Sequence, residues 1–274
     1  MISEGVNAWN KLVTNEHRIH HHCSVNTNTF RASHRKPNLA QVPAEKEFRE
    51  LFIASPGKVM VGADLAGIEL RMLAHYLGRY DGGRYADILL NDDIHQVNAD
   101  KIGITRRQVK TVTYAFLYGA GNQKIGESYD NSLQPKEAKK KGSEIRKAFV
   151  SAIEGLSDLL GAVAAKSTNG FLLACDGRRV LVDSPHKGLN YLLQCSAGVI
   201  AKRWMVIANE AIHNVHTHQL AFVHDELQYE TPPEDAQNLM FLLELSAKMA
   251  GEYYNLRCPI AAEAKTGKNW AEVH

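Results

Sequence analysis

Lys58-Val59-Met60-Val61-Gly62-Ala63-Asp64 is the stretch that decides the fold, because an apolar run of strand-forming residues here ends on a carboxylate. The turn signal Pro56-Gly57 precedes it, and the run has the length and composition of a buried strand. Ile68 to Leu77 then has helical spacing, with its leucines on one side. The sequence therefore predicts a strand that leads directly into a helix, with an acid at the junction.

Further elements follow the same kind of reasoning. Helices are predicted at Asp93–Lys101, from the N-cap Thr105 to Tyr118, and at Pro135–Leu160, Leu189–Ile212 and Asp235–Tyr253. Hairpins are predicted at Phe171–Val182 and Leu220–Glu230. The stretch up to Pro43 is expected to be irregular. Strands and helices are mixed without internal repeats, so the predicted fold class is α+β.

Composition sets broad limits. The 274 residues are 45% hydrophobic and 23% charged, with a net charge of +2, which is typical of an ordinary globular chain and permits a polyanionic partner. No apolar run approaches the roughly 18 residues that span a bilayer, so we expect no membrane partner. Met1 to Asn15 lacks the pattern of a signal peptide. The four cysteines are widely spaced, which favours a reducing cytoplasm.

Two acids stand in segments that are predicted to be core strands. Asp64 ends the first strand, while Asp225 lies inside the second hairpin with Glu226 beside it. A buried carboxylate needs a partner, and an ion pair with Arg or Lys is the simplest one. Two acids from distant strands can instead bind Mg²⁺, a hard cation that prefers carboxylate oxygens and retained water. The residues alone leave both interpretations open.

A basic and aromatic stripe follows the helix that begins after Thr105. Arg106, Lys110, Tyr114 and Tyr118 recur every four residues, so successive side chains advance by only about 40° around the helix. A solvated basic turn followed by core aromatics is one explanation. A nucleotide platform is the other, with cations on the phosphates and rings on the sugar and base.

Three segments, in order, resemble motifs A, B and C of family A DNA polymerases. They are Asp64-Leu65-Ala66-Gly67-Ile68-Glu69-Leu70-Arg71, the run from Arg106 to Gly119, and Val223-His224-Asp225-Glu226. Flanking segments, including Arg31-Ala32-Ser33-His34, Asp93-Ile94-His95 and Asn269-Trp270-Ala271, look most like the replicative polymerases of short-tailed bacteriophages. The resemblance extends from about Arg18 to the last residue.

The resemblance implies a polymerase palm, an antiparallel sheet with helices, and an inserted, mainly helical fingers subdomain. The palm would comprise residues 1–77, with an irregular N-terminal segment, and residues 189–274, while the fingers would comprise residues 78–188. Asp64 and Asp225 would hold two Mg²⁺ ions that promote transfer from a dNTP to a primer 3′-hydroxyl. Glu226 would be an accessory acid near them.

The remaining site residues are also implied by the family motifs. Arg106, Lys110 and His95 would meet the incoming triphosphate. Tyr114 would lie against the sugar and base, and a Tyr at this position goes with acceptance of dideoxynucleotides. Glu69 would close the space beside the sugar C2′ and exclude ribonucleotides.

Four more residues would contact DNA. Tyr118 would stack near the template base, while Arg31, Gln194 and His224 resemble the residues that read the minor groove and support the primer end. Hydrogen bonds to minor-groove acceptors tolerate every base pair. The family usually has Thr-Gly-Arg where this chain has Thr29-Phe30-Arg31, which leaves the placement of Arg31 open, since Phe cannot adopt positive φ cheaply.

The resemblance includes no thumb and no 3′–5′ exonuclease. We therefore expect one half of a split or truncated polymerase, with a separate N-terminal exonuclease and thumb polypeptide as a possible partner and a phage protein's location in the bacterial cytoplasm. The family's thumb-bound processivity partner should not bind this chain. A non-catalytic DNA-binding or assembly module is the alternative function.

Three polar clusters are not assigned a site. They are His20-His21-His22, the group His213, His216 and His218, and Lys139-Lys140-Lys141. Each is more typical of a solvated surface than of a metal or nucleic-acid site.

Overall fold

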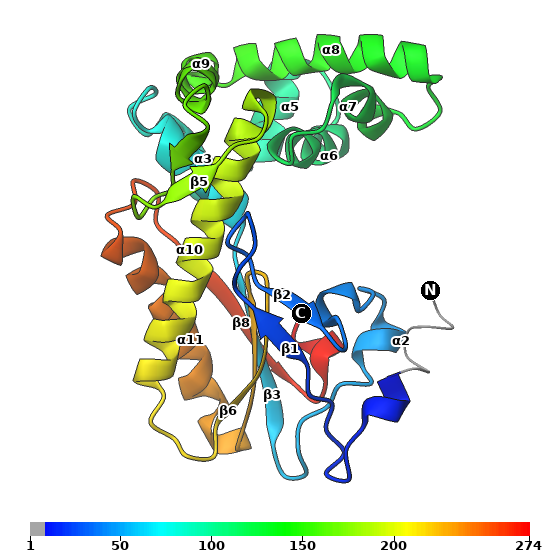
Figure 1. The fold of residues 1–274 in the computed structure, drawn as a ribbon, viewed down its shortest axis with the longest axis vertical. Helices are drawn as coiled ribbons and strands as arrows, with labels where there is room; N and C mark the ends of the chain where they lie inside the picture. The colour runs from blue at the N-terminus through cyan, green and yellow to red at the C-terminus, as the bar shows by residue number, and fades with distance from the viewer. Residues whose placement is uncertain (1–8) are drawn as a thin grey trace. The chain divides into compact units, whose positions relative to one another are not determined.

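The computed structural model describes residues 9–274, and its contacts divide the chain into two units (Figure 1). The first unit contains the chain up to Ala66 together with Ala197–Tyr253 and Ile260–His274, and the second contains Gly67–Ser196 and Tyr254–Pro259. The expected fingers, residues 78–188, fall within the second unit. The first eight residues of the segment expected to begin the palm lie outside the described residues.

A four-stranded antiparallel sheet forms the centre of the first unit. In spatial order its strands are β6 (His218–Val223), β7 (Glu226–Thr231), β3 (Val59–Leu65) and β8 (Ala262–Gly267). The predicted strand and the second predicted hairpin are confirmed as β3 and as β6 with β7. Strand β8 was not predicted, because its short, alanine-containing sequence carries little strand signal of its own.

The two faces of this sheet have different surroundings. Val61, Ala63 and Leu65 of β3 are buried on one face. There, the Tyr229 hydroxyl of β7 donates to Asn209 of α10 (Gly188–Ala211) at 3.0 Å, and α11 (Ala236–Tyr253) contacts both β3 and β8. Because successive side chains alternate, Met60, Gly62 and Asp64 lie on the opposite face. Helices therefore cover one face, and the other face carries the first acid.

The N-terminal part of this unit is more regular than predicted. Its elements are η1 (Asn10–Leu12), β1 (His22–Ser24), β2 (Ser33–Arg35), η2 (Leu39–Gln41) and α2 (Lys46–Arg49). β1 and β2 pair antiparallel, so the expectation of an irregular stretch up to Pro43 was wrong here. The residues of the pair are exposed except for the buried His34, and such short polar strands lack the apolar alternation by which strands are predicted.

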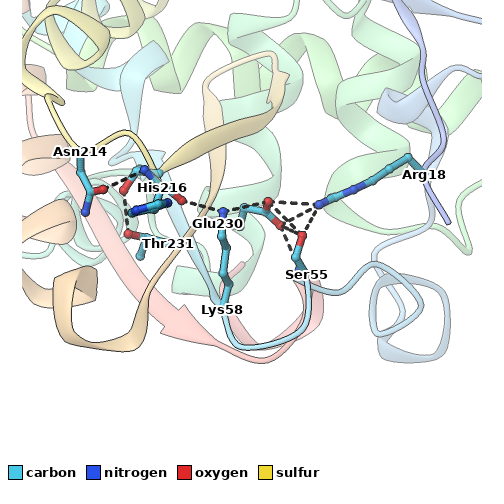
Figure 2. A network of polar contacts seen from close by, with 8 residues as sticks. Arg18, Ser55, Lys58, Asn214, His216, Glu230 and Thr231 are labelled. Carbon is cyan, nitrogen blue, oxygen red and sulfur yellow. Dashed lines mark hydrogen bonds and ion pairs between the residues drawn. The ribbon is translucent and has the colours of Figure 1, made fainter. Parts of the chain in front are cut away.

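Glu230 of β7 joins this N-terminal part to the sheet (Figure 2). Its carboxylate accepts from the Ser55 backbone at 2.9 Å and forms ion pairs with Arg18 at 3.1 Å and Lys58 at 3.4 Å. The Lys58 ammonium also donates to the His216 carbonyl at 2.6 Å. Burial alone would raise the pKa of Glu230, but the hydrogen bonds from Ser55 and Arg18 lower it to about 2.

The second unit consists mainly of helices. They are α3 (Ile68–Leu77), α4 (Arg84–Asn91), α5 (Ile94–Ile102), α6 (Arg106–Leu117), α7 (Asn122–Tyr129), α8 (Pro135–Ala152) and α9 (Leu156–Ser167), followed by the strands β4 (Phe171–Leu173) and β5 (Arg179–Leu181) and the short η3 (Pro185–Lys187). The predicted helices corresponding to α3, α5 and α6 and the hairpin of β4 and β5 are confirmed. In the described residues no single helix is long and apolar enough to cross a membrane.

One helix prediction was wrong. Residues 135–160 were expected to form one helix, but the chain turns after α8, and α9 begins at Leu156. Gly155 has a φ of +75°, and a Cβ at this position would lie 2.6 Å from the Cβ of Tyr80. Only glycine fits both the left-handed backbone and this close approach, so the turn is decided by a tertiary contact.

Glycines also set the spacing of α7 and α8. A Cβ on Gly142 would lie 1.7 Å from the carbonyl oxygen of Asn122, and one on Gly126 would lie 1.9 Å from that of Ala138. The two helix backbones therefore touch directly at these positions, and any side chain there would force them apart.

We expect Gly142→Ala to lower the free energy of unfolding by about 1–3 kcal/mol or more, because the added methyl overlaps a backbone oxygen that cannot move aside. The matched control is Gly161→Ala in α9, where a Cβ would meet nothing within 4 Å. This control should gain about 0.5–1 kcal/mol from helix propensity. Chemical denaturation checks both, and equal effects of the two substitutions would contradict the packing argument.

We also expect the stability of the chain to depend on Glu230 at acidic pH. Since the pKa of Glu230 is lowered on folding, its contribution is present above the ordinary value near 4.5 and is lost as the pH falls towards about 2. Glu230→Gln should cost on the order of 2 kcal/mol at pH 7, and wild type and variant should converge near pH 2. Urea unfolding across this pH range measures the difference in the free energy of unfolding between wild type and Glu230→Gln. A difference that does not change with pH would refute the lowered pKa of Glu230.

Candidate active site

The first group of site residues lies at one end of the sheet in the first unit. Asp64 is the sixth residue of β3, as predicted, whereas the prediction that Asp225 stands within a core strand was wrong, because it lies in the turn that joins β6 to β7. Asp64 pairs in register with Glu226, and the Leu65 N–H donates to the Asp225 carbonyl oxygen at 3.0 Å. His224 makes the tight turn possible with a φ of +59°. Strand pairing thus brings together two acids that are far apart in the sequence.

The three acids at this end differ in exposure. Asp64 is exposed and Asp225 is partly exposed, whereas Glu226 retains only 5% of its accessible surface. Asp64 and Glu226 are direct cross-strand neighbours on one face, where two like charges would repel. Because Glu226 is buried among hydrogen-bond donors, its environment differs from that of Asp64 and Asp225.

Glu226 is held by three side chains of the same unit. Its Oε1 accepts from Nε1 of Trp270 and from Nε2 of Gln228, each at 2.5 Å, and its Oε2 lies 3.1 Å from Nδ1 of His274. Burial would raise the pKa of Glu226, but the bonds from His274 and Trp270 outweigh it, and the pKa lies below its ordinary value. An ionised carboxylate only accepts, so Nδ1 of His274 carries the proton in this contact.

Sequence reasoning missed four residues around these acids. Trp270 was noted only as part of a family segment, and Gln228 and His274 carried no signal that pointed to Glu226. Glu263 of β8 lies directly opposite Asp64 on the other side of β3 and is exposed. The alternation in Ala262-Glu263-Ala264-Lys265 was the one signal that could have placed Glu263 on an exposed strand face.

The exposed pair is suited to Mg²⁺. Within the described residues, no group of three or more His, Cys, Asp or Glu side chains forms a complete metal cage. Mg²⁺ does not require one, because it is usually held by one or two carboxylates together with water and substrate phosphates. Asp64 and Asp225 offer carboxylate oxygens at neighbouring strand ends with access to solvent, which fits that donor set.

The second group lies along α6 in the second unit. Thr105 caps this helix, and Gln108 completes a reciprocal capping box, which defines where the helix begins. Val109, Val112, Thr113, Phe116 and Leu117 are buried. On the remaining surface Arg106, Lys110 and Tyr118 are exposed and Tyr114 is half-buried. The predicted stripe therefore exists, and it is not the core face of the helix.

The start of α6 is tied to the start of α5. Asp93 caps α5 by accepting from the backbone of His95 and Gln96, and it accepts from Nε of Arg106 at 2.5 Å. The His95 ring is 8% exposed, lies 6.2 Å from the Tyr114 ring between centroids, and leaves Nδ1 without a partner in the described structure. Burial lowers the pKa of His95, with Arg106 and Lys110 adding to the effect against Asp93. His95 is therefore neutral near pH 7.

Glu69 and Tyr118 form a pair. Glu69 is in the first turn of α3 and is 7% exposed, while Tyr118 follows the last residue of α6. The Tyr118 hydroxyl donates to Oε1 of Glu69 at 2.9 Å. The resemblance implies separate roles for Glu69 and Tyr118, and the structure links them by a hydrogen bond.

The three expected minor-groove residues are divided between the units. Arg31 and His224 belong to the first unit, and the half-buried Gln194 of α10 belongs to the second. Phe30 adopts a φ of +58°, in the left-handed region that favours glycine, although a phenylalanine stands at this position. A Cβ on Gly198 of α10 would lie 2.8 Å from the Phe30 carbonyl oxygen. The glycine at position 198 therefore allows α10 to approach the backbone at Phe30 closely, and Arg31 follows directly in the chain.

The clusters that were not assigned a site have ordinary surroundings. The His21 ring packs against the ring of His34 at 5.0 Å between centroids. His216 offers its backbone carbonyl to Lys58. Lys141 on α8 lies over the Tyr129 ring at 5.1 Å. Nothing in these contacts indicates a metal or substrate site.

Comparison with known proteins identifies the family of the chain. The family model "DNA polymerase family A" matches residues 1–272. The DNA-directed DNA polymerases of Enterobacteria phage T3 and Escherichia phage T7 are 35% and 36% identical over 99% of the chain, which spans 43% of the length of each relative.

The fold has a solved counterpart. The POL domain of Pol1 from M. smegmatis, in complex with DNA primer-template and dNTP, superimposes with a TM-score of 0.82 at 24% identity, over 98% of this chain and 51% of that one. This likeness confirms the α+β fold class. Since the family model covers nearly the entire sequence, the chain belongs to the family A DNA polymerases.

Proposed function

We propose that this chain is the palm and fingers module of a template-directed DNA polymerase, which transfers a nucleotide from a dNTP to a primer 3′-hydroxyl. The single observation that supports it most is the placement of Asp64 and Asp225 at adjacent strand ends in a chain of this family. The palm would comprise residues 1–77 and 189–274, most of which belong to the first unit. The fingers would be residues 78–188, within the second unit, with helix α6 as the substrate-binding element.

Asp64 and Asp225 would hold two Mg²⁺ ions. When bound, such ions lower the pKa of an attacking hydroxyl and neutralise the charge that develops on a leaving pyrophosphate. The contribution of the chain is to hold both carboxylates at fixed strand positions, so that little rearrangement is needed when substrate arrives. Glu226 would be an accessory acid near the two metal-binding aspartates.

Arg106, Lys110 and His95 would bind the triphosphate. Arg106 is paired with Asp93 while both side chains remain about half exposed. Such an exposed pair contributes little stability, so a polyphosphate can replace the carboxylate on the guanidinium. Lys110 would act as a second point charge one turn later. The neutral His95 can donate a hydrogen bond without adding to the charge.

Tyr114, Glu69 and Tyr118 would select the substrate. Tyr114 would lie against the sugar and base of the incoming nucleotide and permit dideoxynucleotides. Glu69 would exclude a 2′-hydroxyl, and the bond from Tyr118 would keep its carboxylate in place. Tyr118 would also present its exposed ring to the template base.

The partners would be primer-template DNA and dNTPs. Arg31, Gln194 and His224 would contact the minor groove and the primer end. The chain spans 43% of the length of its phage relatives, and the parts of a polymerase that lie outside this module would strengthen DNA binding. The alternative, a DNA-binding module without catalysis, predicts salt-sensitive binding and no nucleotide incorporation.

Asp64→Asn and Asp225→Asn should each lower the primer extension rate by at least about a hundredfold, because loss of metal binding removes several kcal/mol of transition-state stabilisation. The assay uses Mg²⁺ and a labelled primer, with the chain alone and with the N-terminal portion of a phage relative supplied. Glu252→Gln, at an exposed position of α11, is the control, and this variant should extend the primer at the wild-type rate. Extension by Asp64→Asn at the wild-type rate would refute the metal assignment, and templated incorporation by wild type would exclude the alternative function.

Arg106→Ala should raise the KM for dNTP by about tenfold or more, since a hydrogen bond to a charged group contributes about 1.5–3 kcal/mol. Arg107→Ala is a matched control, because Arg107 is an exposed arginine one position along α6 and about 100° away from the stripe. Single-nucleotide incorporation kinetics give the KM for dNTP of each variant. Equal effects at the two positions would mean that general charge, not the stripe, binds the triphosphate.

A further inference from the structure

The segment that ends the sequence lies against the sheet face that carries Asp64. η5 (Trp270–Glu272) and the two residues after it belong to the first unit. A Cβ on Gly62 of β3 would lie 2.5 Å from the Val273 carbonyl oxygen and 2.6 Å from Nε2 of Gln228. Glycine at position 62 therefore lets the closing segment and the Gln228 amide meet beside β3.

This segment is fixed from several directions. The backbone N–H of Trp270 donates to the Phe52 carbonyl at 2.9 Å. The rings of Phe52 and Trp270 meet edge to face, and the Arg49 guanidinium lies over the indole at 5.1 Å. The Lys265 ammonium of β8 donates to the His274 oxygen at 3.1 Å. The indole that contacts Glu226 thus has little freedom to move, and the His274 backbone is tied to β8.

The same segment supports the turn that carries Asp225. Trp270 and Val273 share one core cluster with Met60 of β3 and with Val223, which lies two residues before Asp225. Glu226 follows Asp225 directly, and its two carboxylate oxygens already accept from three donors. The turn is thus held by packing on one side of Asp225 and by hydrogen bonds on the other.

We propose that Trp270 and His274 are positioning residues of the active site, which hold Glu226 inside the sheet face and thereby set Asp225 beside Asp64, so that Glu226 is an anchor and not a metal ligand. The inference rests on the proposed function, since it concerns the carboxylate pair that would bind the metals. It gives a physical reason for the difference in exposure among the three acids, since a carboxylate that is buried among its own donors is less accessible to a cation than an exposed or partly exposed one.

Trp270→Phe and His274→Ala test the proposal. The first removes the indole N–H and keeps an aromatic ring for packing, and the second removes the imidazole. Glu272→Gln is the matched control, because Glu272 accepts from the Lys268 backbone in the same segment and is not among the three donors to Glu226. Hydrogen–deuterium exchange of residues 222–228 reads the turn without metal or DNA. We expect faster exchange in the two test variants and wild-type exchange in the control; unchanged exchange in both test variants would overturn the proposal.

Mn²⁺ affinity, measured by electron paramagnetic resonance on the chain without DNA, is the second readout. Trp270→Phe and His274→Ala should bind Mn²⁺ about tenfold more weakly, as is usual when a group that orients a metal ligand is lost. His274→Asn, which retains an N–H donor, should restore part of the affinity, and Glu272→Gln should not change it. If Glu226→Gln loses Mn²⁺ while both test variants bind it like wild type, Glu226 is itself a ligand and the proposal is wrong.

Failure of the proposed function has a different signature. Wild type and Asp64→Asn would then bind Mn²⁺ equally and neither would extend a primer, while the exchange differences at the turn would still report whether the closing segment holds Glu226.

Discussion

The pairing of β3 with β7 on one side and β8 on the other is the constraint on which the candidate active site depends. In antiparallel strands the register fixes which side chains are opposite each other, and a shift by one residue would turn every side chain to the other face. Here the register places Asp64 between Glu226 and Glu263 and next to the Asp225 turn. The helices on one face support this register, because a shift by one residue would turn Val61, Ala63 and Leu65 away from them.

Carboxylates that lie close together repel one another, and in this sheet the neighbouring carboxylates have different environments. Glu226 is buried and satisfied by Trp270, Gln228 and His274, whereas Asp64 remains exposed. The same principle governs Glu230 four residues later on the same face, where Arg18, Lys58 and Ser55 surround the carboxylate. Glu226 and Glu230 are therefore each buried among donors, whereas Asp64 lies exposed near the end of its strand.

The second unit prepares its residues in another way. Two helix starts are coupled by Asp93, which caps α5 and pairs with Arg106 at the beginning of α6. Local capping thus orients the cation that leads the stripe, and the Tyr118–Glu69 bond fixes the other end of the helix to α3. The arrangement needs few long-range contacts, because a regular helix spaces the four side chains by itself.

The sequence by itself determined the family, the fold class and most regular elements, because apolar periodicity, the Thr105 cap and the three motifs are local signals. It also identified the stripe on α6, since the spacing of four residues is a property of the helix alone. The position of α9 after Gly155, strand β8 and the hairpin of β1 and β2 were decided only by tertiary structure, where close contacts and strand partners outweigh weak local preferences. The same holds for Glu226, whose neighbours Trp270 and His274 are more than 40 residues away in the sequence and meet it only because the closing segment lies on the sheet.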